Sequence, residues 1–311
     1  MRSARRSSYW LAAVVLALAL GVVLGARLLS GPIVSGLRLE NGELQAQIRA
    51  ISADSDALSQ RLAAADRFDA QMSGRIVRDA LAGKSVVLFR TPDAEDGDVD
   101  AVSQMVGQSG GTVTGTISLT AEFVDGNSAE KLRSVVNSPV VPAGARLDTT
   151  LVDPSAQAGD LLGTAVMINR DPKVPPVGDE ARDTVLAALR DTGFLAYGNR
   201  LAPADTAVVI TGGALSEDAG TQGLGVARFA SALAPHGRGV VLAGRDGSAT
   251  GVAAVAVVRG EAGMARAVST VDDIGAASGR ITAVLALQSM IAGASPGSYG
   301  VGAGAASVTV Q

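Results

Sequence analysis

The side chains with the clearest chemical potential gather in one acidic run, where five carboxylates stand among the eight residues from Asp93 to Asp100. Oxygen ligands of this kind attract divalent cations, but the spacing lacks the alternating ligands and terminal glutamate of a calcium-binding EF-hand loop. The run favours a solvated loop whose acids lie at the N-terminus of a helix, where the helix dipole stabilises negative charge. A divalent cation site is the alternative.

Two further positions invite a chemical reading. Gly212 and Gly213 follow an apolar run, where a doubly wound α/β fold could bind phosphate, but neither a Gly-x-Gly-x-x-Gly fingerprint nor a Walker lysine follows, so a turn is predicted. His236, between Pro235 and Gly237, has no evident serine or acid constellation, which favours a surface or capping histidine over a catalytic base. No serine lies in a Gly-x-Ser-x-Gly elbow. We assign no catalytic residues and expect that the chain is not an enzyme.

The composition restricts metal chemistry. The chain has no cysteine and a single histidine, which excludes disulfides, thiolate catalysis, zinc-hydrolase sites and multi-histidine copper centres. Its methionines form no Met-x-x-Met cluster, and we predict that they fill the core. Besides the start, they are Met72, Met105, Met167, Met264 and Met290. No cofactor-binding residues are assigned, and metal-binding residues stay unknown.

The 311 residues include 26 basic and 30 acidic ones, with a net charge of −4. This balance gives no electrostatic footprint for nucleic acid, which we exclude as a partner. Hydrophobic residues make up 47% of the chain. The chain is therefore long and apolar enough to build a proper core rather than stay disordered.

Residues 10–29 form an apolar segment with Arg27 as its only charge. As a helix, such a segment spans about 30 Å and matches the hydrocarbon core of a bilayer. The basic tail 1–9 precedes it, so the positive-inside rule places this tail in the cytoplasm and everything after Ser30 outside. The alternative is a cleaved signal peptide. An uncleaved anchor is favoured because no Ala-x-Ala stands here, and Val23-Leu24-Gly25 is the nearest approximation.

A heptad pattern follows the anchor over residues 37–76. The seam residues are Leu37, Leu44, Ile51, Leu58, Ala65 and Met72, with Ile48, Leu62 and Ile76 on the companion positions. The pattern is typical of a coiled coil, and Asn41, Ser55 and Asp69 on the companion positions reduce its stability. We predict a homodimer or higher homo-oligomer. The alternative is one amphipathic helix that folds back on the globular part.

The region 84–291 is predicted to be α/β with a mostly parallel sheet, because short strand-like runs alternate with helical ones. The expected strands are 84–90, 112–119, 207–211, 239–243 and 252–258; the expected helices are 99–108, 128–136, 181–191, 224–234 and 274–291. Prolines mark loops over 139–178, around the apolar run Leu161–Ile168, as a candidate boundary or insertion. Residues 292–311 are rich in Gly, Ala and Ser and are expected to form a flexible tail.

Two segments resemble the MctB copper-transport family of mycobacteria and related actinobacteria. One is the run Ser8–Gly25 followed by the heptads; the other leads from Ser269–Asp273 through Gly279–Leu287 to Gly297–Gly300. With the α/β order between them, the similarity covers nearly the whole chain, and its C-terminal part is the more specific.

The resemblance implies a membrane protein of the cell envelope that keeps intracellular copper low, described in the family as a pore-like efflux component of the outer membrane. Copper would then be the transported ion. The ligand-poor composition leaves a second function open, namely a non-enzymatic coiled-coil scaffold or interaction module that engages another envelope protein and regulates cell-wall remodelling or division. Whether the anchor lies in the inner or the outer membrane stays open.

Overall fold

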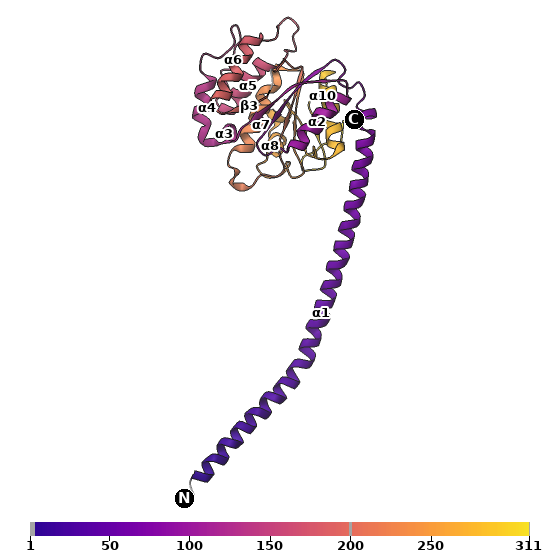
Figure 1. Cartoon of the computed structure of the whole chain (residues 1–311), viewed down its shortest axis with the longest axis vertical. Coiled ribbons are helices and arrows are strands. Elements are labelled where there is room, and N and C mark those ends of the chain that lie inside the picture. The colour runs from indigo at the N-terminus through magenta and orange to yellow at the C-terminus, as the bar shows by residue number, and fades with distance from the viewer. Residues whose placement is uncertain (1–3, 199–200, 311) are drawn as a thin grey trace. The chain divides into compact units, whose positions relative to one another are not determined.

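The computed structural model describes the backbone of residues 4–198 and 201–310, and the side chains of residues 10, 13–24, 43–198 and 201–310. Contacts divide the chain into two units, Met1–Ala65 and Asp66–Gln311. A single helix, α1 (Ala4–Ile76), accounts for most of the first unit (Figure 1). The predicted anchor and heptads therefore belong to one continuous helix, which ends within the second unit.

The described part of α1 bears on both predictions for it. No helix of the searched residues has a stretch long and apolar enough to cross a membrane. The side chains at 11–12 and 25–29 of the predicted anchor, and those of Leu37 and Asn41, lie outside the described residues. The described heptad residues Leu44, Ile51 and Leu62 are 51%, 69% and 63% exposed. These described seam residues are exposed to solvent in the single chain.

The second unit, which we call the head, is built on a sheet whose strands run in the order β3-β2-β1-β4-β5-β6-β7. All neighbouring strands pair in parallel except β2 and β3, which are antiparallel. The strands are β1 (Ser85–Arg90), β2 (Thr112–Leu119), β3 (Leu195–Tyr197), β4 (Thr206–Ile210), β5 (Gly239–Ala243), β6 (Ser269–Val271) and β7 (Ser298–Tyr299). Every residue of β4 and β5 is buried, as expected for central parallel strands covered on both faces.

Helices cover both faces of this sheet (Figure 1). They are α2 (Asp96–Gln108), α3 (Ala121–Val124), α4 (Ala129–Val136), α5 (Pro154–Val166), α6 (Asp179–Asp191), α7 (Gln222–Leu233), α8 (Ala254–Gly260), α9 (Ala262–Ala265) and α10 (Ala277–Ile291), with short 3-10 turns at Gly126–Ser128, Glu217–Ala219 and Ala234–His236. Val87 and Phe89 of β1 pack with α4 to α8, whereas Val86 and Leu88 pack with α2 and α10. Alternate side chains of β1 thus belong to two separate hydrophobic cores, one on each face of the sheet. The predicted α/β class is confirmed.

Two predicted elements are wrong in type. The run 252–258, expected as a strand, lies largely in α8, where Ala254, Val255 and Val258 are buried. That spacing follows the period of a helix rather than the alternation of a strand. The run Leu161–Ile168, expected among loops, lies largely in α5, whose N-terminus is capped by the Asp153 carboxylate. The candidate boundary at 139–178 falls inside one compact unit and contains this core helix.

The C-terminal residues differ from the flexible tail expected for 292–311. Strand β7 joins the sheet edge, and the buried Asp272 carboxylate accepts hydrogen bonds from the backbone N–H groups of Val301 and Gly302, at 2.8 and 3.0 Å. Arg259 pairs with Asp272 at 2.6 Å and donates to the carbonyl oxygens of Tyr299 and Ala303. Buried polar contacts hold this glycine-rich segment, and Tyr299 and Val310 pack against the core on the α2 and α10 side of the sheet.

Candidate functional site

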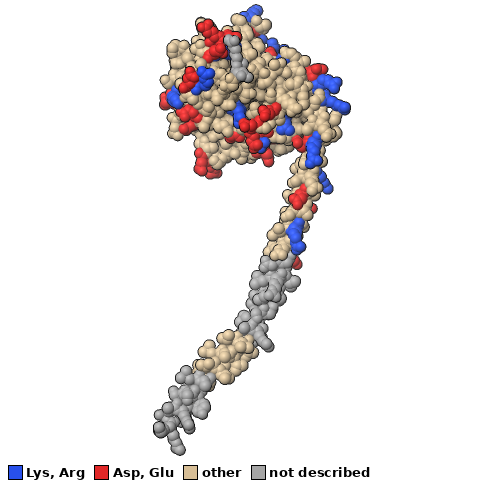
Figure 2. All heavy atoms as spheres, viewed as in Figure 1, with Lys and Arg blue, Asp and Glu red and all other residues tan. Residues whose placement is uncertain are grey.

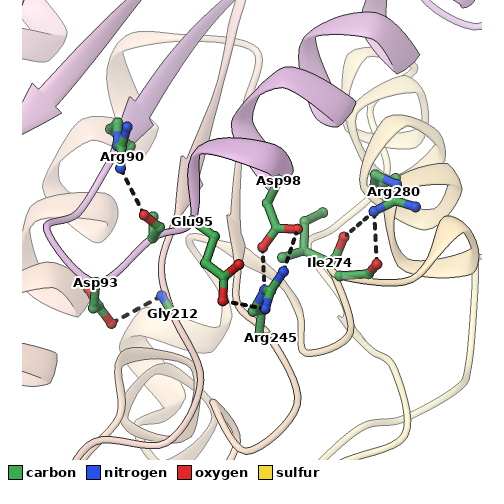
Figure 3. A network of polar contacts seen from close by, with 10 residues as sticks. Arg90, Asp93, Glu95, Asp98, Gly212, Arg245, Ile274 and Arg280 are labelled. Carbon is green, nitrogen blue, oxygen red and sulfur yellow. Dashed lines mark hydrogen bonds and ion pairs between the residues drawn. The ribbon is translucent and has the colours of Figure 1, made fainter.

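A doubly wound sheet binds ligands where its strand order reverses, outside the carboxyl ends of the strands. In this head that point lies between β1 and β4. Asp93, from the loop after β1, occupies it: its carboxylate accepts hydrogen bonds from the Gly212 N–H at 3.0 Å and from the hydroxyls of Thr91 and Thr211 (Figure 3). A Cβ at position 212 would overlap Asp93. The Asp93 carboxylate at this point is therefore hydrogen-bonded by the protein's own groups.

Three other acids of the 93–100 run pair with arginines, and Figure 3 shows the two that contact Arg245. Asp98 is buried at the start of α2 and pairs with Arg245 at 2.6 Å, and Glu95 pairs with the same guanidinium. The hydrogen bond to Asp98 is the main cause that raises the pKa of Arg245 above its ordinary value. Asp96 pairs with Arg90.

The expectation of a solvated acidic loop holds for most of the run. The acids lie at a helix N-terminus, as predicted, and Glu95, Asp96 and Asp100 are exposed, whereas Asp98 is buried. Glu95, Asp96 and Asp98 also have arginine partners. Gly212 lies in the loop after β4, with a bend at Gly213, and the close approach of Asp93 explains why a glycine stands at position 212.

His236 has an acidic partner that the sequence does not reveal. Its Nε2 lies 2.6 Å from Asp160 Oδ1, and the other Asp160 oxygen accepts from the Asp148 N–H at 2.7 Å. The ring covers Gly163, where a Cβ would overlap it. His236 and Asp160 lie 76 residues apart, and Asp160 is buried on α5, a helix absent from the predicted elements. The sequence could have indicated the His236–Asp160 pair only if the helix α5 had been predicted.

The pair lines a cavity of about 630 Å³ between the 146–153 loop and helices α5, α7 and α9, with Leu147, Leu151 and Met264 among its apolar walls. A carboxylate that orients a histidine is one half of a nucleophile-activating arrangement. No hydroxyl among the described residues hydrogen-bonds to His236. Asp160 therefore orients the imidazole ring, but the described residues place no nucleophile against it.

Metal ligation has little support from side-chain positions. Within residues whose side chains are described, no group of three or more His, Asp or Glu side chains could hold a metal ion. Met167 and Met264 are buried in the core on one face of the sheet, and Met105 and Met290 in the core on the other. These four thioethers fill the cores, as predicted.

The fold and this geometry define a doubly wound α/β head with an internally hydrogen-bonded carboxylate at its switch point, preceded in sequence by one long helix. The family described as "Copper transport outer membrane protein, MctB" matches residues 1–310. Proteins named "Copper transporter MctB" from Mycobacterium tuberculosis and Mycobacterium bovis are 59% identical over 313 residues, covering 100% of both chains. The protein of that name from Mycobacterium leprae is 58% identical over 315 residues, covering 100% of this chain and 99% of its own. The chain belongs to the MctB family.

Proposed function

We propose that this chain acts in copper homeostasis of the cell envelope, as a component of copper transport out of the cell. The observation that carries the proposal is the similarity to proteins named copper transporters at 59% identity over the full length of both chains. It acts as a transport protein, not as an enzyme, in line with the names of its relatives.

Deletion and complementation test this function. We expect a strain without the gene to accumulate copper, and the wild-type gene to restore the wild-type content, measured by elemental analysis of washed cells. Zinc and iron contents serve as controls, since a general permeability defect would change them too. An unchanged copper content in the deletion strain would contradict the proposal.

For localisation, we propose that residues 10–29 anchor the chain in a membrane of the envelope, with the tail 1–9 in the cytoplasm and the head outside. The apolar run and the basic residues before it support this orientation. Because the chain has no cysteine, Ser3→Cys and Ser216→Cys each introduce a single thiol. We expect a membrane-impermeant maleimide to label only the second in intact cells. Labelling of the Ser3→Cys variant alone would indicate the opposite orientation.

A second candidate function rests on the exposed heptad seam of α1. Leu44, Ile48, Ile51, Leu58 and Leu62 are all more than half exposed. Apolar seams of this kind are covered by a second helix, which supports a parallel homodimer that acts as a scaffold and engages another envelope protein. Crosslinking in intact envelopes followed by capture of the chain tests this candidate. Recovery of a distinct envelope protein that depends on Leu58 favours the scaffold, whereas recovery of this chain alone leaves the homodimer as the whole assembly.

A further inference from the structure

A pocket of about 380 Å³ opens at the edge of the sheet where β5, β6 and β7 begin. Arg238 directly precedes β5, Arg266 lies just before β6, and the loop 293–296 leads into β7. Arg170, from the loop after α5, completes the basic lining. The pocket thus lies at the edge of the sheet opposite the switch point.

The lining of this pocket is basic. Three arginines line it, and none of the described residues in its wall is acidic. Arg238 forms an ion pair with Asp205 from outside the pocket at 3.5 Å, but its buried Nε has no hydrogen-bond partner. The other Asp205 oxygen already accepts two hydrogen bonds from Ser85.

The other two guanidinium groups add further donors. Arg170 donates through Nε to the Gly237 carbonyl. The Arg266 side chain is exposed, and among the described residues its guanidinium has neither a hydrogen-bond nor an ion-pair partner. Each guanidinium carries five N–H donors and no acceptor. The pocket therefore offers far more donors than its walls satisfy.

We propose that this pocket binds a phosphate-bearing anion. Guanidinium forks match phosphate oxygens bidentately, and several forks around one concavity are the usual means of holding such a group. The chain as a whole has a net charge of −4, whereas the lining of this pocket has three arginines and no acidic residue. The cavity suits a small phosphate ester or a lipid headgroup, whose shared chemistry is the phosphate.

Calorimetric titration of the full-length protein in a non-ionic detergent with inorganic phosphate tests the proposal. Arg266→Gln removes one donor set without breaking any internal contact, and we expect it to weaken phosphate binding by at least about tenfold. Arg78→Gln, an exposed arginine outside the pocket, is the matched control and should change the affinity by less than about twofold. Wild-type protein that takes up no phosphate at millimolar concentration, or equal affinities for wild type and Arg266→Gln, would overturn the proposal.

Arginine footprinting distinguishes the two sources of phosphate. Full-length protein is placed in nanodiscs of phosphatidylcholine or phosphatidylglycerol, treated with phenylglyoxal and analysed by peptide mass spectrometry. Protection of Arg266 in phosphatidylglycerol without added phosphate assigns the site to an anionic headgroup. Protection that needs added phosphate assigns it to a soluble ester. Modification of Arg266 as fast as Arg78 under all conditions would show that no phosphate binds there.

Discussion

The Arg259–Asp272 contact is the most deeply buried ion pair of the described residues, with side chains only 4% and 2% exposed. Burial of two charges is costly, and the pair persists because backbone groups satisfy the remaining donors and acceptors. The Asp272 carboxylate binds the N–H groups of Val301 and Gly302, while Arg259 binds two carbonyl oxygens. The pair thus joins α8, the end of β6 and the C-terminal segment.

Arg259→Met should therefore destabilise the head by about 3–5 kcal/mol, because it leaves the Asp272 carboxylate buried without its cation. Urea unfolding of the fragment 66–311, followed by circular dichroism, measures this change. Arg78→Met is the matched control, and we expect it to leave the unfolding midpoint nearly unchanged. A midpoint for Arg259→Met equal to that of wild type would contradict the argument.

The neighbouring Asp273 gives a pH-dependent prediction. Burial, aided by the charge of Asp272, raises the pKa of Asp273 above its ordinary value, and its Oδ1 has no hydrogen-bond partner. A raised pKa in the folded state means that ionisation opposes folding: the penalty is complete above the folded pKa and disappears below the unfolded value of about 3.9. Asp273→Asn should therefore raise the Tm at pH 7, by a few degrees at most, with a gain that vanishes towards pH 4.

Thermal unfolding at several pH values checks this prediction. Asp100→Asn, at an exposed carboxylate of the same run as Asp98, controls for the change in net charge. A lower Tm for Asp273→Asn at pH 7 would show that the charged form contributes to stability instead.

Copper gives a further prediction at the residue scale. The fragment 37–311 should hold no tight copper site, because strong copper centres recruit Cys, His or clustered Met ligands. The single histidine is engaged by Asp160, and Met105 and Met167 lie in different cores. Competition titration against a chelator should detect no submicromolar binding. Stoichiometric submicromolar binding that is lost in His236→Ala, or in a Met105→Ala/Met167→Ala double variant, would refute this reading.

At the scale of elements, buried strands and amphipathic helices were predictable because each produces a local pattern of apolar residues that a short stretch of sequence already shows. β2 and β5 have the predicted bounds, 112–119 and 239–243, and β1, β4 and α10 differ by one to three residues. α8 was missed because a Val-rich heptapeptide fits either period, and β3, β6 and β7 are too short to show one. The contacts of the site were less accessible, since Arg245 and Asp98 lie 147 residues apart and meet only after the sheet forms.

The heptad seam of α1 predicts a dimer that single substitutions should disrupt. Leu44→Asp and Leu58→Asp should each convert a parallel dimer of the fragment 37–311 to monomer, since each buries an unpaired charge in an apolar seam at a cost of a few kcal/mol. Sedimentation equilibrium measures the change. A charge at an exposed position off the seam, as in Gln60→Asp, should leave the dimer intact. A wild-type fragment that sediments as a monomer at high concentration would contradict the dimer.

At the scale of the whole molecule, the charge of the visible surface is mixed. On the face of the head shown in Figure 2, basic and acidic side chains are interspersed with neutral surface, without a large field of one sign. That nucleic acid is not a partner stays a prediction from the net charge of −4.

The anchor gives the prediction for the whole chain. We expect the apolar segment to remain in the mature protein, because Val23-Leu24-Gly25 makes a poor cleavage site. Intact-mass spectrometry of protein purified from envelopes measures the mature N-terminus. A chain that starts near Ala26 would show that the segment is a cleaved signal peptide.

The pinning of the C-terminal segment also affects biosynthesis. β7 and the residues after it follow every other strand of the sheet in the chain, yet the Arg259–Asp272 pair needs the backbone groups of Tyr299, Val301 and Gly302 to satisfy its hydrogen bonds. During synthesis, the head can therefore satisfy this pair only after Gly302 has left the ribosome. In a polypeptide that is truncated before Tyr299, the Arg259–Asp272 pair would lack some of its hydrogen-bond partners at the edge of the sheet. We expect such a chain to be more susceptible to proteases than the full chain.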